Sequence, residues 1–457
     1  MLAARVAPSP LIDSAAVDQQ LIDRLGEWIA IPSISADEAH AADVARAGEW
    51  LCERIRAAGG AAELADWEGH PLALGELRAS GGGESAPTVL CYGHFDVQPP
   101  DPLELWETPP FEASVRNGQV FGRGIADDKG QLFLLLEAAS RLARAGELPV
   151  NVRFACDGEE ETGGHSIVEY LAVDERGADV CVIFDSGMVA RDVPAFNIAT
   201  RGLCYMHLTL RSGEGDLHSG IYGGAALNAV NALARILQAV LPGDDGRLPE
   251  ALRQGLVPPT EEERAAWASL PAGADELAGQ GAHPMDSAAA EQFYLRTWAE
   301  PAVDVNGIAG GSPLLQKTVL PVEAVANLSI RLAPGQDPDH IAAEVERLLR
   351  ETTPAGAELV VEHWASSAPG LVDQSSKAIQ LGLDAFERAL GVRPLLIRSG
   401  GTLPIVPALE HKGIPTVLTG FALPDSNIHS PNERMELEYL PRGIEAAEEL
   451  FRSFAAL

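Results

Sequence analysis

The fold is decided by residues 88–93, TVLCYG, and by three similar runs: VNVRFAC at 150–156, ADVCVIF at 178–184 and IPTVLTG at 414–420. Each run is short, rich in β-branched side chains, and does not alternate between apolar and polar residues. Such runs are typical of strands that are buried on both faces of a parallel sheet. Helical patterns lie between them, for example over 130–145. The sequence therefore predicts an α/β domain with a mostly parallel sheet covered by helices.

The middle of the chain follows a different pattern. Residues 204–212, CYMHLTLRS, and 322–334, VEAVANLSIRLAP, alternate between apolar and polar side chains, as strands with one exposed face do. A helical stretch follows each of them, near 225–241 and 337–351. Two strand-then-helix units predict a smaller α+β domain inserted into the larger one. The expected division is 1–199 for the first part of the larger domain, 200–365 for the inserted domain and 366–457 for the second part.

The charge balance excludes several classes of partner. The 457 residues carry 33 basic and 66 acidic side chains, a formal net charge of −33. A nucleic-acid binder needs a basic surface, whereas an acidic surface repels phosphate backbones and anionic membranes. No apolar stretch approaches the roughly 18 residues of a membrane span. The N-terminus, MLAARVAPSPLIDSAAVDQQ, has no long apolar segment of the kind found in secretory signals. We therefore expect neither a nucleic-acid partner nor a membrane partner.

The cysteines indicate the cellular compartment. They are odd in number and form no CxxC pair: Cys52, Cys91, Cys156, Cys181 and Cys204. Most of them lie inside apolar runs, where a free thiol packs as a small hydrophobic side chain. A disulfide framework is not expected, which favours a reducing compartment and a cytoplasmic protein.

Side chains that commonly bind metals follow each buried run. In open parallel sheets, ligands bind beyond the carboxyl ends of the strands, so these residues should converge. Each one alone has an ordinary explanation as a turn residue, a helix cap or a carboxylate that stabilises a helix dipole. The hypothesis of a metal site rests on their coincidence. The residues are His94 and Asp96 after the first run, Glu159, Glu160 and Glu161 after the second, Asp185 after the third, His429 beyond the fourth, and Asp127 before the helix at 130.

The combination of ligand types favours two borderline divalent ions. Two histidines with three carboxylates suit Zn²⁺, Mn²⁺ or Co²⁺, and one bridging carboxylate can hold two ions about 3.5–4 Å apart. Asp96 lies two residues after His94, so on an extended backbone both side chains point the same way, and Asp96 can accept the second imidazole N–H. The three consecutive glutamates diverge, so one can bind a metal while another faces the bound water as general base.

The motifs together resemble a known family. They are GHFDVQPPD, FGRGIADDKGQ, DGEEETGG, FDSG, DLHSGIYGG and NIHSPNER. In this order they are similar to those of the di-zinc peptidase family, which includes carnosinase-like dipeptidases, glutamate carboxypeptidase, acetylornithine deacetylase and succinyl-diaminopimelate desuccinylase. The resemblance covers most of the chain, including the inserted domain, which in the family is a lid that also dimerises. It implies two divalent ions per subunit, with zinc as the first choice, and a homodimer.

The resemblance also implies a role for each residue of the metal site. His94 and Asp185 would hold one metal, Glu161 and His429 the other, and Asp127 would bridge them. Glu160 would be the general base. A cis peptide bond would follow Asp127.

On the lid, the resemblance implies that His218 reaches the active site of the partner subunit and polarises the scissile carbonyl. It further implies that Arg331 and Arg398 clamp the substrate carboxylate, which Arg pairs with bidentately. Each of the two arginines has a structural ion pair as its alternative. Gly400, Gly401 and Thr402 would form a loop that approaches the substrate closely.

The segment VQPPDPLELWETPPFE, with DDKG and DLHSGIYGG, looks most like the carnosinase-like dipeptidase branch. The first interpretation is therefore a metallopeptidase that cleaves dipeptides or short peptides. Two alternatives stay open. One is an N-acyl amino acid deacylase or desuccinylase that uses the same two-metal site, against which DDKG argues mildly. The other is a non-catalytic metal-bound scaffold, against which the complete set of ligands and base argues.

Overall fold

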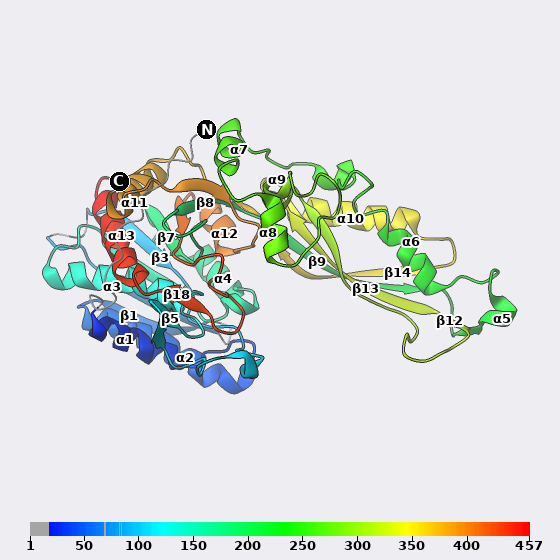
Figure 1. Ribbon diagram of the computed structural model, residues 1–457, viewed down its shortest axis with the longest axis horizontal. Coiled ribbons are helices and arrows are strands. Elements are labelled where there is room, and N and C mark those ends of the chain that lie inside the picture. Colours follow the sequence, from blue (N-terminus) through cyan, green and yellow to red (C-terminus); the bar gives the residue numbers. More distant parts are fainter. Residues whose placement is uncertain (1–17, 68–69, 82, 84) are drawn as a thin grey trace. The chain divides into compact units, whose positions relative to one another are not determined.

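The computed structural model describes residues 18–67, 70–81, 83 and 85–457. Residues 1–17, which make up most of the stretch interpreted above for a secretory signal, lie outside the described residues. The chain divides into two compact units (Figure 1). The first comprises the residues up to Ile198 together with Val372–Leu396 and Ala408–Leu457, and the second comprises Ala199–Leu371 with Ile397–Pro407. Within the described ranges, no helix is both long enough and apolar enough to cross a membrane.

The first unit is built on a mixed sheet in the order β1-β2-β6-β3-β7-β17-β8. Its central strands β6, β3, β7 and β17 are parallel, whereas β1, β2 and β8 run antiparallel to their neighbours. All residues of β6, β7 and β17 are buried, which is why their sequences do not alternate. The predicted mostly parallel α/β sheet is therefore confirmed. The strands are β1 (Ala61–Trp67), β2 (His70–Leu77), β3 (Thr88–Tyr92), β6 (Asn151–Asp157), β7 (Val180–Phe184), β8 (Ala195–Thr200) and β17 (Thr416–Thr419).

Helices cover this sheet. Five of them share a hydrophobic core with the sheet, and Figure 1 shows α1, α3 and α13 on the same side of it. The most deeply buried is α3 (Lys129–Ala145), in which nearly every side chain of the first three turns is buried. Because α3 begins directly after Asp127 and Asp128, it anchors that segment firmly. The other helices of this core are α1 (Gln19–Ile29), α2 (Ala41–Ala57), α11 (Lys377–Leu390) and α13 (Tyr439–Phe454).

Smaller elements complete the first unit. Helix α4 (His165–Val173) packs against β2 and β6. A short antiparallel ribbon has the strand order β18-β5-β4. Along the chain, β5 precedes Asp127 and β18 follows His429, so the ribbon pairs the two segments that carry these residues. Its strands are β4 (Ser114–Arg116), β5 (Gln119–Phe121) and β18 (Arg434–Glu436).

The second unit has its own hydrophobic core beneath an antiparallel sheet in the order β11-β13-β9-β14. Along β9 and β13, buried and half-buried residues alternate, as the sequence pattern predicted. Helices α6 (Ala229–Leu237) and α10 (Pro338–Thr352) contribute their buried residues to this core. The strands are β9 (Gly202–Arg211), β11 (Ala302–Ala309), β13 (Glu323–Leu332) and β14 (Glu358–Ser367).

Three short helices lie between α6 and β11 along the chain, and they were not predicted from the sequence: α7 (Glu261–Trp267), α8 (Gly273–Gly279) and α9 (Phe293–Trp298). Other short elements are β10 (Leu217–His218), α5 (Ser219–Tyr222), β12 (Val319–Leu320), β15 (Gly370–Leu371), β16 (Leu395–Arg398) and α12 (Ile405–His411). Four 3-10 turns are η2 (Glu38–His40), η3 (Leu103–Leu105), η4 (Glu160–Thr162) and η5 (Glu250–Arg253).

Candidate active site

The predicted metal ligands converge at the carboxyl ends of the parallel strands of the first unit. His94 follows β3, Glu161 follows β6, and Asp185 follows β7 directly. Because parallel strands end at the same edge of a sheet, these side chains meet there. Two groups of three residues have ligand atoms that lie within 4.8 Å of one another: His94, Asp127 and Asp185, and Asp127, Glu161 and His429.

Asp127 belongs to both groups. Its Oδ1 lies 3.0 Å from Nε2 of His94, and its Oδ2 lies 2.8 Å from Nε2 of His429. Nε2 of His429 also lies 3.1 Å from Oε2 of Glu161, and Nε2 of His94 lies 3.9 Å from Oδ1 of Asp185. The peptide bond between Asp127 and the next residue is cis, as the resemblance implied. One carboxylate thus faces both histidines, which is the arrangement that a ligand bridging two ions needs.

The electrostatics of the cluster favour cations. Burial, with a further contribution from neighbouring carboxylates, raises the pKa of Glu160 to about 9 and that of Asp185 to about 7. Hydrogen bonds to Asp127 and Glu161 raise the pKa of His429 to about 10. The metal-free cluster therefore holds protons that it would lose to solvent when a metal ion binds. The nitrogen and oxygen donors, their closeness and this excess of carboxylates all fit two divalent ions.

Asp96 holds both His94 and the acidic turn in place. Its Oδ1 accepts a hydrogen bond from the N–H of Glu160 (3.2 Å), and its Oδ2 accepts one from the N–H of Glu161 (3.1 Å). Nδ1 of His94 lies 3.3 Å from the same Oδ1 and 3.1 Å from the carbonyl oxygen of Asp96. Because Nδ1 is engaged in this way, Nε2 is left to face Asp127.

The consecutive glutamates have different surroundings. Glu160 points into the cluster, where its Oε2 lies 4.0 Å from Nε2 of His94, and its side chain keeps 17% of its surface exposed. Glu159 turns away from the cluster, because its Oε1 accepts a hydrogen bond from the N–H of Ser166 (2.6 Å) and its Oε2 lies 3.0 Å from Nδ1 of His70. Glu160 is therefore the one of the two that is placed to touch a water molecule at the metal cluster.

The substrate residues implied by the resemblance lie in the second unit. Nη1 of Arg331 donates a hydrogen bond to Oγ1 of Thr402 (2.8 Å). Arg201, which sequence reasoning missed, donates its Nε to the carbonyl of Gly400 (3.1 Å) and its N–H to the carbonyl of Gly401 (3.0 Å). Burial and the nearby charge of Arg331 lower the pKa of Arg201 to about 10. Two guanidinium groups therefore hold one loop, and within the described part of the chain neither has an ion-pair partner.

Arg398 is placed differently from Arg331. Its guanidinium is buried and paired with Glu263, so the structure contains the internal ion pair that the sequence left open as the alternative to a substrate clamp. A substrate carboxylate would have to displace Glu263 to reach it. The clamp role of Arg398 stays a prediction.

His218 lies at the end of β10 in the second unit and is exposed. Its Nδ1 accepts a hydrogen bond from the N–H of Gly220 (3.0 Å), which fixes the ring at the start of α5. Nε2 is the ring nitrogen that remains for other partners.

Sequence reasoning also missed two residues that contact the candidate metal ligands directly. Nε2 of Gln98 donates a hydrogen bond to Oε2 of Glu161 (2.8 Å). The carboxylate of Glu433 accepts a hydrogen bond from the N–H of Asp127 (3.1 Å). Both lie inside motifs quoted above, but nothing in a single sequence separates them from their neighbours.

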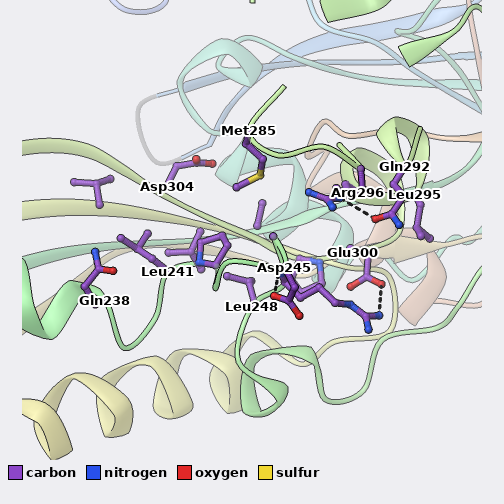
Figure 2. Close-up of a pocket in the computed structure, with 18 residues that line it drawn as sticks. Gln238, Leu241, Asp245, Leu248, Met285, Gln292, Leu295, Arg296, Glu300 and Asp304 are labelled. Atoms are coloured by element: carbon purple, nitrogen blue, oxygen red, sulfur yellow. Dashed lines mark hydrogen bonds and ion pairs between the residues drawn. The ribbon is translucent and has the colours of Figure 1, made fainter. Parts of the chain in front are cut away.

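A cavity of about 630 Å³ lies in the second unit (Figure 2). Its wall combines apolar side chains such as Leu241 and Leu295 with charged groups that are largely neutralised by internal partners. Arg296, for instance, pairs with Asp286 and also donates its Nε to Oε1 of Gln292 (3.1 Å). None of the residues that line the cavity is a predicted ligand, base or substrate contact, so the cavity plays no part in the chemistry considered below.

Comparison with known proteins is consistent with this geometry. The Cys-Gly metallodipeptidase dug1 of Schizosaccharomyces pombe is 27% identical, with 93% of this chain and 93% of that protein covered. The Beta-Ala-His dipeptidase of Homo sapiens is 27% identical, with 91% of this chain and 86% of that protein covered.

Among solved structures, human carnosine dipeptidase 1 superimposes with a TM-score of 0.76 at 25% identity and covers 96% of both chains. An M20 family metallo-carboxypeptidase from Sulfolobus solfataricus superimposes with a TM-score of 0.84 at 26% identity, over 96% of this chain and 100% of that one. The sequence also matches the family description over residues 90–453, which is most of the chain. The chain therefore belongs to peptidase family M20/M25/M40.

Proposed function

We propose that this chain is a metallodipeptidase that hydrolyses the amide bond of dipeptides or short peptides at a site for two divalent ions. The observation that carries the proposal is the position of Asp127, whose two carboxylate oxygens lie 3.0 Å and 2.8 Å from the facing nitrogens of His94 and His429. The names of similar proteins support the substrate class, because Cys-Gly and Beta-Ala-His are dipeptides.

Zinc is the first choice for both ions, with manganese and cobalt as alternatives, because this donor set accepts all three. His94 and Asp185 would hold one ion, Glu161 and His429 the other, and Asp127 both. When bound, the ions draw electron density from the substrate carbonyl and lower the pKa of a water molecule.

Glu160 acts as the general base in this proposal. Its carboxylate takes one proton from the water, whose oxygen then forms a bond to the carbonyl carbon. The protonated Glu160 returns that proton to the amide nitrogen as the C–N bond breaks, which gives a carboxylic acid and an amine. The acid then loses the second proton of the water to the amine, so the products are a carboxylate and an ammonium ion. Burial raises the pKa of Glu160 in the metal-free protein, and two bound cations would lower it again and leave the carboxylate ionised to act as the base. Asp96 keeps Glu160 and His94 in position through its hydrogen bonds.

Several finer points belong to the same proposal. Arg331 and Thr402 would bind the substrate carboxylate, and His218 of a second copy would stabilise the oxyanion, which makes the enzyme a homodimer. Residues 200–365 would form the lid that carries these groups. The five cysteines are all free and buried, which supports a place in the reducing cytoplasm.

The decisive experiment compares two substrate panels on metal-stripped protein, with and without added Zn²⁺ or Mn²⁺. One panel contains mixed dipeptides, and the other contains N-acetyl and N-succinyl amino acids. We expect metal-dependent release of free amino acids from the dipeptides. Metal-dependent cleavage of the acylated amino acids alone would contradict the proposal and favour a deacylase. Cleavage of dipeptides without any metal would contradict the proposed mechanism.

A further inference from the structure

The carboxylate of Glu433 is surrounded by donors from one short segment. Its Oε1 accepts hydrogen bonds from the N–H groups of Ala126 (2.8 Å) and Asp127 (3.1 Å). Its Oε2 accepts hydrogen bonds from the N–H of Gly124 (3.0 Å) and from Nη1 of Arg123 (2.7 Å). The side chain is fully buried. One carboxylate thus fixes the backbone of the segment that ends at the shared ligand.

The ion pair with Arg123 neutralises the charge of Glu433. Arg123 is itself almost fully buried, with 1% of its side chain exposed, and its Nη2 donates to the carbonyl of Pro99 (3.1 Å). Replacing a buried ion pair by apolar residues of similar volume is often neutral for stability, so stability alone does not call for this pair. What an apolar pair cannot supply is the directional contact with three backbone N–H groups, those of Gly124, Ala126 and Asp127.

Glu433 also belongs to the segment that carries His429. His429 has a φ of +58°, a left-handed conformation that is uncommon and strained for a residue other than glycine. The loop around it is closed by the amide of Asn427, which donates to the carbonyls of Pro431 (3.2 Å) and Asn432 (3.4 Å). Glu433 follows directly and joins this loop to the Asp127 segment. The side chain of Glu433 therefore fixes the position of Asp127 relative to His429, and these are two of the three residues in the Asp127–Glu161–His429 group.

We propose that Glu433 is a positioning residue that sets the affinity of the Asp127–Glu161–His429 group for its divalent ion. The inference rests on the proposed function, because it requires that the cluster binds two ions. The His94–Asp127–Asp185 group depends on it less, since Asp96 and β3 hold His94 independently.

The experiment measures the number of bound Zn²⁺ ions and their dissociation constants by competition with a chromophoric chelator. A second titration with Co²⁺ follows the absorption of the bound ions, which distinguishes the two metal positions. We compare the wild-type chain with Glu433→Gln and Glu433→Asp. Glutamine loses the acceptor for at least one of the four donors, and aspartate is one methylene too short to reach them all. We expect the wild type to bind two ions and Glu433→Gln to weaken the second ion about ten- to hundred-fold while the first is kept. Glu433→Asp should lie between them.

Glu436→Gln is the matched control. Glu436 lies three residues away, is buried, and contacts Gln119 and Arg191 instead of the segment that carries Asp127. The Glu436→Gln variant should bind both ions as the wild type does. Wild-type affinities for both ions in Glu433→Gln, or an equal loss in Glu436→Gln, would overturn the inference and leave the proposed function standing. A wild-type chain that binds no divalent ion would overturn both. If Glu433→Gln does not fold, Glu433→Asp carries the same comparison.

Discussion

Arg398 and Glu263 form a buried two-point ion pair, in which Nε of Arg398 lies 2.6 Å from Oε1 of Glu263 and Nη2 lies 3.2 Å from Oε2. Nη1 and Nη2 of Arg398 also donate to the carbonyls of Val257 (2.9 Å) and Pro258 (3.3 Å). Oε2 of Glu263 accepts the N–H of Thr260 (2.6 Å) and so completes the cap of α7. The pair therefore joins the segment carrying Gly400 to Thr402 to the inserted helices of the second unit.

Breaking this pair should loosen the second unit. We expect Glu263→Gln to lower the free energy of unfolding by about 3–5 kcal/mol, because it leaves the buried guanidinium of Arg398 without a charged partner. Urea unfolding measures the loss, and hydrogen–deuterium exchange of peptides covering 257–267 localises it. If the peptides covering 257–267 exchange hydrogen for deuterium at the wild-type rate in the variant, the prediction is contradicted.

Arg347→Gln is the control for that experiment. Arg347 pairs with Glu344 and Glu351 on the exposed surface of α10, with 44% of its side chain exposed. Exposed pairs contribute little, so this substitution should change the free energy of unfolding by less than about 1 kcal/mol. The contrast separates the loss of a buried ion pair from the loss of an exposed one.

Replacing the proposed base should separate chemistry from metal binding. We expect Glu160→Gln to lower kcat by about a hundred- to ten-thousand-fold, because glutamine cannot accept the proton of the attacking water. The bound metal content should stay at that of the wild type, since Glu160 is not among the predicted ligands. Steady-state hydrolysis of a dipeptide, with metal analysis of the same samples, measures both quantities.

Glu159→Gln provides the neighbouring control, because Glu159 binds the N–H of Ser166 and His70, and a glutamine oxygen can still accept from that N–H. We expect its kcat to remain close to that of the wild type. Near-normal turnover in Glu160→Gln with metals still bound would show that another group is the base.

Metal binding should weaken as the pH falls. The pKa of His429 in the metal-free protein is raised to about 10 by Asp127 and Glu161, so at neutral pH a metal ion must displace the proton from this ring. Below that pKa, the affinity for the ion held by His429 should fall by up to about tenfold per pH unit for each proton displaced. Below about pH 7, protonation of Asp185, whose pKa is about 7, should steepen the dependence for the other position.

The measurement is the dissociation constant of Zn²⁺ at several pH values, together with calorimetry in two buffers of different ionisation enthalpy, which counts the released protons. A dissociation constant that does not change between about pH 6 and pH 8, with no proton release, would contradict the prediction.

The strands and the convergence of the candidate ligands could be predicted because their signals are local. Runs such as ADVCVIF have no polar face, which only a fully buried strand permits, and β7 is indeed buried throughout. A residue that directly follows such a strand, as Asp185 does, is then placed at the carboxyl edge by topology alone. The same logic brought His94 and Glu161 to the cluster.

The supporting contacts could not be predicted because their partners are far apart in the chain. The bond from Asp127 to Glu433 spans 306 residues, that from Arg201 to Gly400 spans 199, and the Arg398–Glu263 pair spans 135. Each contact involves an ordinary arginine or glutamate whose role depends on its three-dimensional neighbour. The short helices α7 to α9 were missed for a related reason, since helices of six or seven residues carry little periodicity.

Removing Arg331 should weaken binding of substrates that have a free C-terminal carboxylate. A hydrogen bond to a charged group contributes about 1.5–3 kcal/mol, so we expect Arg331→Gln to raise KM for a dipeptide such as Gly-Leu by about ten- to hundred-fold. The amidated dipeptide lacks the carboxylate, so its KM should not change between wild type and variant. Arg211→Gln serves as the control, because Arg211 lies on β9 of the same sheet and pairs with Glu323 on the exposed surface. If Arg331→Gln raises KM equally for the free and the amidated dipeptide, Arg331 supports the fold of the loop through Thr402 and does not bind the carboxylate.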